Sequence, residues 1–248
     1  MQKLVRTGFG TNNVDHCTRL CHASSVAALL ENIGSGAVTA SFAECRNAEA
    51  IIVIGANPTV NHPVAATFIK NAAQRGARLY ILDPRGQHLD RYATESLRFS
   101  PGSDVAMLNA MINVIITEEL YDADYVAKQT EGFEDLKART AHTTPEAMAP
   151  ICGVDADTLR RVARGYATAG SAMIFWGMGI SQHTHGTDNS RCLISLALLT
   201  GNVGRAGTGL HPLRGQNNVQ GASDAGLIPM FFPCLLYTSD AADERSWG

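Results

Sequence analysis

The sequence predicts an α/β protein built on a doubly wound, mostly parallel sheet. Short apolar runs rich in β-branched residues alternate along the chain with segments of helical length and helical apolar spacing. The runs end in Gly, Asn, Asp or Ser, as buried parallel strands do where they lead into ligand-binding loops. The 248 residues include 23 glycines, which suits many tight loops better than a helical bundle.

The first helix and the first strand are expected between residues 24 and 54. Residues 24–34 carry apolar side chains at helical spacing, with Ser24 or Ser25 as a cap and Gly34 as the stop. Residues 51–54 are wholly apolar and β-branched, which predicts a parallel strand buried on both faces.

A strand–loop–helix–strand unit of the length that a βαβ crossover needs follows directly. The first strand ends at Gly55, and residues 64–74 predict a helix that Gly76 terminates. Residues 78–82 predict the second strand, which residues 83–85 close with Asp-Pro-Arg.

The next part of the chain repeats this alternation more loosely. Residues 97–99 predict a short strand that leads through residues 101–104 into an apolar helix over residues 105–117. Residues 122–150 read as short helices with acidic first turns, and we expect them to form a peripheral insertion. Residues 155–167 predict an amphipathic helix.

The last predicted strand covers residues 173–176 and ends in a Gly-Met-Gly sequence. Residues 189–200 predict a long apolar helix, which Gly201 and Asn202 terminate. Residues 204–226 are dense in Gly and Asn and read as loop.

Charge and cysteine content exclude several classes of protein. The net charge of −3 gives no reason to expect a nucleic-acid partner or a membrane surface. No apolar run is long enough to span a bilayer, and the first residues lack the apolar core of a secretory signal. We therefore predict a cytoplasmic protein whose irregularly spaced cysteines are thiols: Cys17, Cys21, Cys45, Cys152, Cys192 and Cys234.

Four loops follow predicted strands and should therefore meet at one edge of the sheet: residues 55–62, 83–85, 102–104 and 177–182. Their Gly, Asn, Asp and Ser residues offer backbone N–H groups and short polar side chains, which suits a nucleotide-like cofactor. Neither common nucleotide-binding fingerprint is present in them, and α/β loops are often rich in Gly, so the spacing by itself leaves cofactor binding open.

Six segments carry a resemblance to a known family, in the order NNVDHCTRLCHASSVAALL, IGANPTVNHP, DPR, PGSD, WGMGISQ and LRGQNNVQGASDAG. Together they resemble the molybdopterin-dependent formate dehydrogenases of the dimethyl-sulfoxide-reductase superfamily, over residues 11–233. The stretch ISQHTHGTDNSRCLISL is most similar to the soluble, NAD-linked, multi-subunit type. A Rossmann-like domain that binds molybdopterin dinucleotides is the fold that this resemblance implies.

The resemblance implies a cofactor of two molybdopterin guanine dinucleotides that hold one molybdenum or tungsten. The residues that it places around this cofactor are Gly55, Asn57, His62, Asp83, Arg85, Gly102, Asp104, Gly177, Met178, Gly179 and Gln182. It also implies a [4Fe-4S] cluster on a four-cysteine motif upstream of these residues. A partner subunit would carry flavin and NAD.

Four further residues are implied to be catalytic. Cys21 would be the metal ligand, because a thiolate binds a soft metal, and His22 would assist proton transfer. Arg214 would hold formate through two parallel hydrogen bonds, and Gln216 would orient formate or a pterin. Taken singly, Cys21 could be an inert thiol, His22 a helix cap and Arg214 a surface residue.

The resemblance also divides the chain. We expect a remnant of a preceding domain over residues 1–16, the cofactor-binding domain over 17–216 and the start of a return into a neighbouring domain over 217–233. Residues 234–248 resemble a translated transposase sequencing adapter. We expect little activity from this fragment alone. The competing interpretations are a nitrate-reductase-like molybdopterin oxidoreductase and a non-catalytic nucleotide-binding α/β module.

Overall fold

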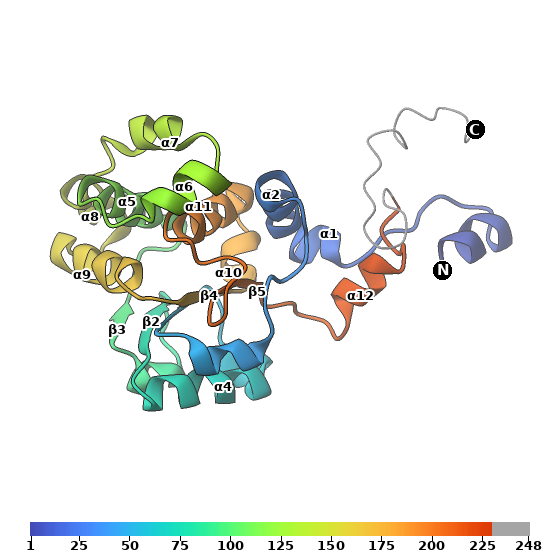
Figure 1. Ribbon diagram of the computed structural model, residues 1–248. Coiled ribbons are helices and arrows are strands. Elements are labelled where there is room, and N and C mark those ends of the chain that lie inside the picture. Colours follow the sequence, from blue (N-terminus) through green and yellow to red (C-terminus); the bar gives the residue numbers. More distant parts are fainter. Residues whose placement is uncertain (230–248) are drawn as a thin grey trace. The chain divides into compact units, whose positions relative to one another are not determined.

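A computed structural model describes residues 1–229 (Figure 1), so the adapter-like residues 234–248 lie outside the described part. The chain folds into two compact units. The larger unit is Ser24–Leu213, and the smaller one joins Met1–Ala23 to the chain from Arg214 onward.

The larger unit contains a five-stranded sheet in which every neighbouring pair of strands is parallel. The strands lie in the order β3-β2-β1-β4-β5. Their bounds are β1 Ala50–Ile54, β2 Arg78–Leu82, β3 Glu95–Leu97, β4 Ala172–Trp176 and β5 Gly209–Pro212. This arrangement confirms the predicted fold class.

The carboxyl ends of the three central strands are level with one another. Ile54 at the end of β1 pairs with Leu82 of β2 on one side and with Trp176 of β4 on the other. The chain runs outward from β1 to β2 and β3, and then returns to β4 on the opposite side of β1. The loops after β1 and β4 therefore diverge, and this opens the crevice in which doubly wound sheets bind ligands.

The sheet is buried on both faces, which explains why its central strands are uninterrupted apolar runs. Successive residues of β1 point to opposite faces: Ile52 and Ile54 belong to one core, and Ile51 and Val53 to the other. The first core packs against α5, α8, α9 and α11, and the second against α4 and the 3-10 helix η2 (Phe42–Asn47) (Figure 1).

The α-helices have the following bounds: α1 Thr18–Cys21, α2 Ala23–Ile33, α3 Pro58–Asn61, α4 Pro63–Gln74, α5 Asp104–Thr117, α6 Ala123–Gln129, α7 Phe133–Thr140, α8 Pro145–Cys152, α9 Ala156–Ala167, α10 Met178–Ser181, α11 Gly186–Leu199 and α12 Val219–Asp224. A π-helix, η1, spans Leu4–Gly8, and a 3-10 helix, η3, spans His88–Tyr92. None of the helices within residues 1–229 is long and apolar enough to cross a membrane.

The structure differs from the sequence-based prediction in several places, among them the predicted loops 55–62 and 177–182, which contain the short helices α3 and α10. Residues 204–226 are not all loop, because they contain β5 and α12. The short strand predicted over residues 97–99 lies two residues earlier, as β3. The two strands concerned, β3 and β5, lie at the edges of the sheet. Polar residues such as Glu95 in β3 and His211 in β5 break the apolar pattern that marks a central strand. Finally, α11 begins at Gly186 rather than at residue 189.

Candidate cofactor-binding and active site

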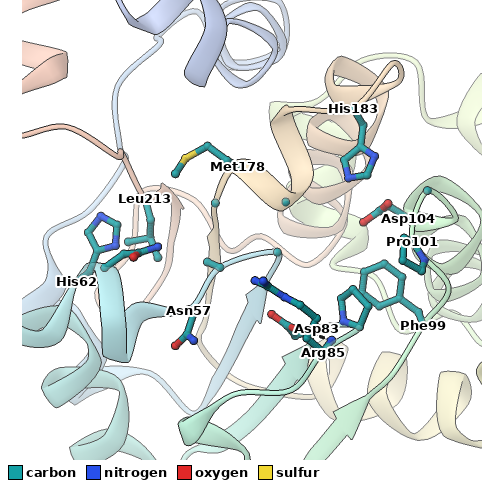
Figure 2. A pocket seen from close by; sticks show the side chains of 17 residues that line it. Asn57, His62, Asp83, Arg85, Phe99, Pro101, Asp104, Met178, His183 and Leu213 are labelled. Carbon is teal, nitrogen blue, oxygen red and sulfur yellow. Dashed lines mark hydrogen bonds between the residues drawn. The ribbon is translucent and has the colours of Figure 1, made fainter.

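A cavity of about 340 Å³ lies at the carboxyl ends of the strands of the larger unit (Figure 2). Every strand contributes residues that follow it: Gly55 after β1, Asp83 after β2, Gly102 after β3, Gly177 after β4 and Leu213 after β5. The four loops that were predicted to meet at one edge therefore do so.

The cavity lining includes the predicted cofactor-binding residues Gly55, Asn57, His62, Asp83, Arg85, Gly102, Asp104, Gly177, Met178 and Gly179. The exception is Gln182, which follows α10 with an exposed side chain and does not line this cavity. Phe99 and His183 also line it but were not predicted as cofactor-binding residues. Phe99 is the last residue of a predicted strand and His183 directly follows a predicted strand-end loop, and these positions were the available signals.

Glycines let the backbones of two loops touch across the cavity floor. Gly55 has a φ of +57°, and its carbonyl oxygen accepts a 3.0 Å hydrogen bond from the N–H of Gly179. A Cβ on Gly179 would lie 2.7 Å from the Cα of Gly55, and a Cβ on Gly177 would lie 2.8 Å from the Gly55 oxygen. No side chain fits there, so backbone lines this part of the cavity and a bound group can approach it closely.

The loop after β2 is shaped by its own carboxylate. Asp83 is buried, and its Oδ1 accepts hydrogen bonds from the N–H groups of Arg85 at 2.8 Å and Gly86 at 3.0 Å. This turn leaves the side chain of Arg85 exposed at the cavity, where a guanidinium can bind a phosphate or a ribose hydroxyl.

Asp104, the first residue of α5, places a carboxylate in the cavity wall although it is only 1% exposed. Among residues 1–229, no donor forms a hydrogen bond of normal geometry with either of its carboxylate oxygens. Burial raises the pKa of Asp104, and the N–H of Asp104, the nearby His183 and the N–H of Gly102 oppose the rise. Figure 2 shows His183 next to this carboxylate at the same end of the cavity.

These features fit a guanine dinucleotide of the kind that the resemblance implies. Guanine presents two N–H donors along one edge, and the two carboxylate oxygens of Asp104 can accept a hydrogen bond from each of them. The side chain of Arg85 and the backbone of Gly55, Gly177 and Gly179 suit the phosphates.

The four predicted catalytic residues, Cys21, His22, Arg214 and Gln216, all belong to the smaller unit. Cys21 is 9% exposed and His22 is fully buried. Burial lowers the pKa of Arg214, while the charges of Cys21 and Asp224 oppose this shift, so the Cys21 side chain acts electrostatically on the guanidinium. The smaller unit thus brings the Cys-His segment together with the Arg-Gly-Gln segment, which lies far away in the sequence.

Hydrogen bonds join these two segments. Cys17 Sγ donates to Gln216 Oε1 at 2.9 Å, between residues that are 199 positions apart. Ser223 Oγ lies 3.2 Å from Thr18 Oγ1 and 3.2 Å from His16 Nδ1. The segment that ends in α1 is therefore tied both to the loop after Arg214 and to α12.

The sequence pattern of the molybdopterin oxidoreductase family matches residues 1–236. Formate dehydrogenase H of Escherichia coli is 44% identical over the whole of this chain and 35% of its own length. The F420-dependent formate dehydrogenase subunit alpha of Methanocaldococcus jannaschii is 44% identical over 94% of this chain and 35% of its own length.

Among solved structures, acetylene hydratase from Pelobacter acetylenicus matches with a TM-score of 0.71 and 30% identity, over 77% of this chain and 26% of that protein. This chain spans about a third of the length of the curated relatives that it matches. The match to the family pattern covers nearly the whole chain, and the relatives agree with it. The chain belongs to the molybdopterin oxidoreductase family.

Proposed function

We propose that the full-length protein is the catalytic subunit of a formate dehydrogenase. It oxidises formate to carbon dioxide and releases two electrons and one proton. The observation that supports this proposal is that Cys21 and Arg214 belong to one compact unit, in which Cys21 acts electrostatically on the Arg214 guanidinium. A thiol can bind a soft metal, and a guanidinium can bind a carboxylate. Relatives at 44% identity are named formate dehydrogenases.

Arg214 binds the substrate in this proposal. A guanidinium keeps its charge in a protein even where burial lowers its pKa, and its two parallel N–H groups match the two oxygens of formate. Such a pair fixes the direction of the formate C–H bond, which Lys cannot do with a single ammonium group. Gln216, two residues later, helps to orient the same anion.

Cys21 holds the metal, and His22 accepts the proton that formate releases. An imidazole titrates near neutral pH and can take up and return a proton during turnover. His22 is fully buried next to Cys21 in the sequence, so bulk water does not compete directly for its ring nitrogens.

The bis-(molybdopterin guanine dinucleotide) group with molybdenum or tungsten supplies the electron acceptor when it is bound. The cavity of the larger unit would hold one guanine dinucleotide part, with Asp104 on the guanine and Arg85 with the glycine backbone on the phosphates. Gln182 remains a proposed pterin contact.

We propose that electrons leave through a [4Fe-4S] cluster of the full-length protein to a flavin-bearing partner subunit that reduces NAD in the cytoplasm. The ISQHTHGTDNSRCLISL segment supports the NAD-linked type. Relatives named F420-dependent make a deazaflavin the competing acceptor. Offering NAD and F420 separately to the purified complex, with formate as donor, would decide between them.

The central test uses the full-length protein purified with its cofactor and a dye as the electron acceptor. Arg214→Lys should raise KM for formate by ~10- to 100-fold, because the charge stays but one of two charge-assisted hydrogen bonds is lost. The exposed Arg139 provides the control: Arg139→Lys should leave KM unchanged.

Formate oxidation that is insensitive to Arg214→Lys would contradict the assignment of this residue. A full-length protein that hydrates acetylene or reduces nitrate, but does not oxidise formate, would contradict the proposed activity. Residues 1–233 expressed alone should show little turnover with the same dye.

A further inference from the structure

We propose that Cys17 is a positioning residue that holds the side-chain amide of Gln216 in one orientation beside Cys21. The proposal rests on the function proposed above, because it takes Gln216 to face the substrate. Cys17 is not a metal ligand in this proposal and does not touch formate.

The position of Cys17 follows from the turn of helix that Cys21 ends. Cys17 is the N-cap residue of α1 with helical backbone angles, and its carbonyl oxygen accepts a 3.1 Å hydrogen bond from the N–H of Cys21. Residues four apart on a helix share a face, so the two side chains are neighbours. The thiols of Cys17 and Cys21 do interact with each other.

The hydrogen bond from Cys17 determines which end of the Gln216 side-chain amide, the carbonyl oxygen or the NH2 group, faces Cys17. The thiol donates to Oε1 at 2.9 Å, so the carbonyl end of the amide faces Cys17. The NH2 group is then the end left to donate. An anion bound by Arg214 can accept such a bond, whereas a flipped amide would offer it a repelling oxygen.

Other contacts hold the two segments together without Cys17. Thr18 and Ser223, both 4% exposed, share a hydrogen bond, and His16 makes a second one to Ser223. Cys17 is only half-buried and Gln216 is exposed. Losing the bond between Cys17 and Gln216 should therefore free one side chain without loosening the fold.

The experiment is a double-mutant cycle in the full-length holoenzyme, with Cys17→Ala, Gln216→Ala and the double variant. Cys17→Ala should raise KM for formate by ~5-fold, the value of one ordinary hydrogen bond, and leave kcat within about 2-fold. Cys17→Ser keeps an O–H donor and should restore KM to within about 2-fold of the parent. The double variant should be no worse than Gln216→Ala alone.

Hydrogen exchange of the metal-free protein gives a readout that does not depend on turnover. Cys17→Ala should speed exchange of the backbone amides of residues 215–218, and Cys17→Ser should not. The molybdenum content of the purified variants should equal that of the parent, because no metal ligand is changed.

The outcomes separate this proposal from the proposed function. If Gln216→Ala raises KM but Cys17→Ala does not, or if Cys17→Ser behaves like Cys17→Ala, the role of Cys17 is wrong and the function stands. If Cys17→Ala loses metal or unfolds, the role of Cys17 is structural, which also overturns the proposal. If Gln216→Ala leaves KM unchanged, the roles of Gln216 and Cys17 are both wrong while the formate dehydrogenase activity stands. If the parent does not oxidise formate, the proposed function itself fails.

Discussion

Gly55 and Gly179 lie in backbone contact, with the N–H of Gly179 donating to the carbonyl oxygen of Gly55 at 3.0 Å. This contact ties the loop after β1 to the short helix after β4, the two elements that diverge at the centre of the sheet. The floor of the cavity therefore depends on the absence of a side chain at either position.

Gly55→Ala should lower the free energy of unfolding more than Gly→Ala does at another glycine with positive φ that has open space around it. Gly34 is the matched control, because its φ of +71° is similar but no atom lies within 4 Å of the added Cβ. We expect Gly34→Ala to cost ~1 kcal/mol from backbone strain alone, and Gly55→Ala to cost ~3 kcal/mol because Gly179 must also move. Urea unfolding followed by tryptophan fluorescence measures both, and equal losses would contradict the close approach.

Asp104→Asn should stabilise the cofactor-free chain and weaken nucleotide binding. Burial raises the pKa of Asp104, so the ionised carboxylate is costly at pH 8, and a neutral amide should add ~1 kcal/mol of stability. The same change replaces one of the two carboxylate oxygens that would accept from guanine with an NH2 group. The affinity for guanosine diphosphate, measured by calorimetry, should therefore fall by ~10-fold.

The sign of the stability change at Asp104 follows from linkage. A carboxyl whose folded pKa is raised contributes its full stability at low pH and loses it as the pH rises through the folded value. The gain from Asp104→Asn should therefore shrink as the pH falls. Asp90 is the control: burial alone would raise its pKa, but hydrogen bonds from Gln87, Arg98 and Ser96 lower it, so Asp90→Asn should lose stability at pH 8. A loss of stability in both variants would show that the Asp104 carboxylate is satisfied.

His211 should make the chain less stable in mild acid. Its ring stacks on both Phe42 and Phe175, with centroids at 5.0 and 4.8 Å, and burial lowers its pKa from 6.5 to about 4. The folded state therefore keeps the ring neutral while the unfolded state takes up a proton between these values. From pH 7.5 to pH 5, this difference should remove ~2 kcal/mol of the free energy of unfolding.

His211→Phe keeps the aromatic stack and cannot titrate. Its free energy of unfolding should fall less between pH 7.5 and pH 5 than that of the parent, by the same ~2 kcal/mol. The exposed His142 is the control, and His142→Phe should keep the parent's dependence on pH. Identical pH dependence in the parent and in His211→Phe would show that the buried ring is not the cause.

Ser25 should stabilise the larger unit through a buried hydrogen bond to Trp176. The indole Nε1–H donates to Ser25 Oγ at 2.8 Å, and both residues are fully buried. Ser25→Ala should cost ~2 kcal/mol, because the buried indole N–H loses its acceptor. In a Trp176→Phe background the same change should cost ~1 kcal/mol less, as measured by urea unfolding, and strict additivity would argue against the bond.

The sequence by itself determined the elements that form the centre of the fold. Ile51 to Ile54 and Met173 to Trp176 are apolar without interruption because both faces of a central parallel strand are buried, and this local pattern can be read directly. The loop residues after these strands could also be predicted from the sequence, because Gly or Asp-Pro marks where each strand ends. The carboxyl ends of parallel strands lie at one edge of the sheet, so the loops that follow them meet there.

Tertiary structure alone decided the edge strands, the order of the strands and the partners within the site. β5 carries Gly209, His211 and Pro212 and becomes a strand only because β4 offers it hydrogen-bond partners. The return of the chain to pair β4 with β1 opens the cavity. Tertiary packing also buries the Asp104 carboxylate, with which no donor of residues 1–229 forms a hydrogen bond of normal geometry. Cys17 and Gln216 meet across 199 positions. Contacts at such separation depend on how distant segments pack, and local patterns of apolar and polar residues carry no record of that packing.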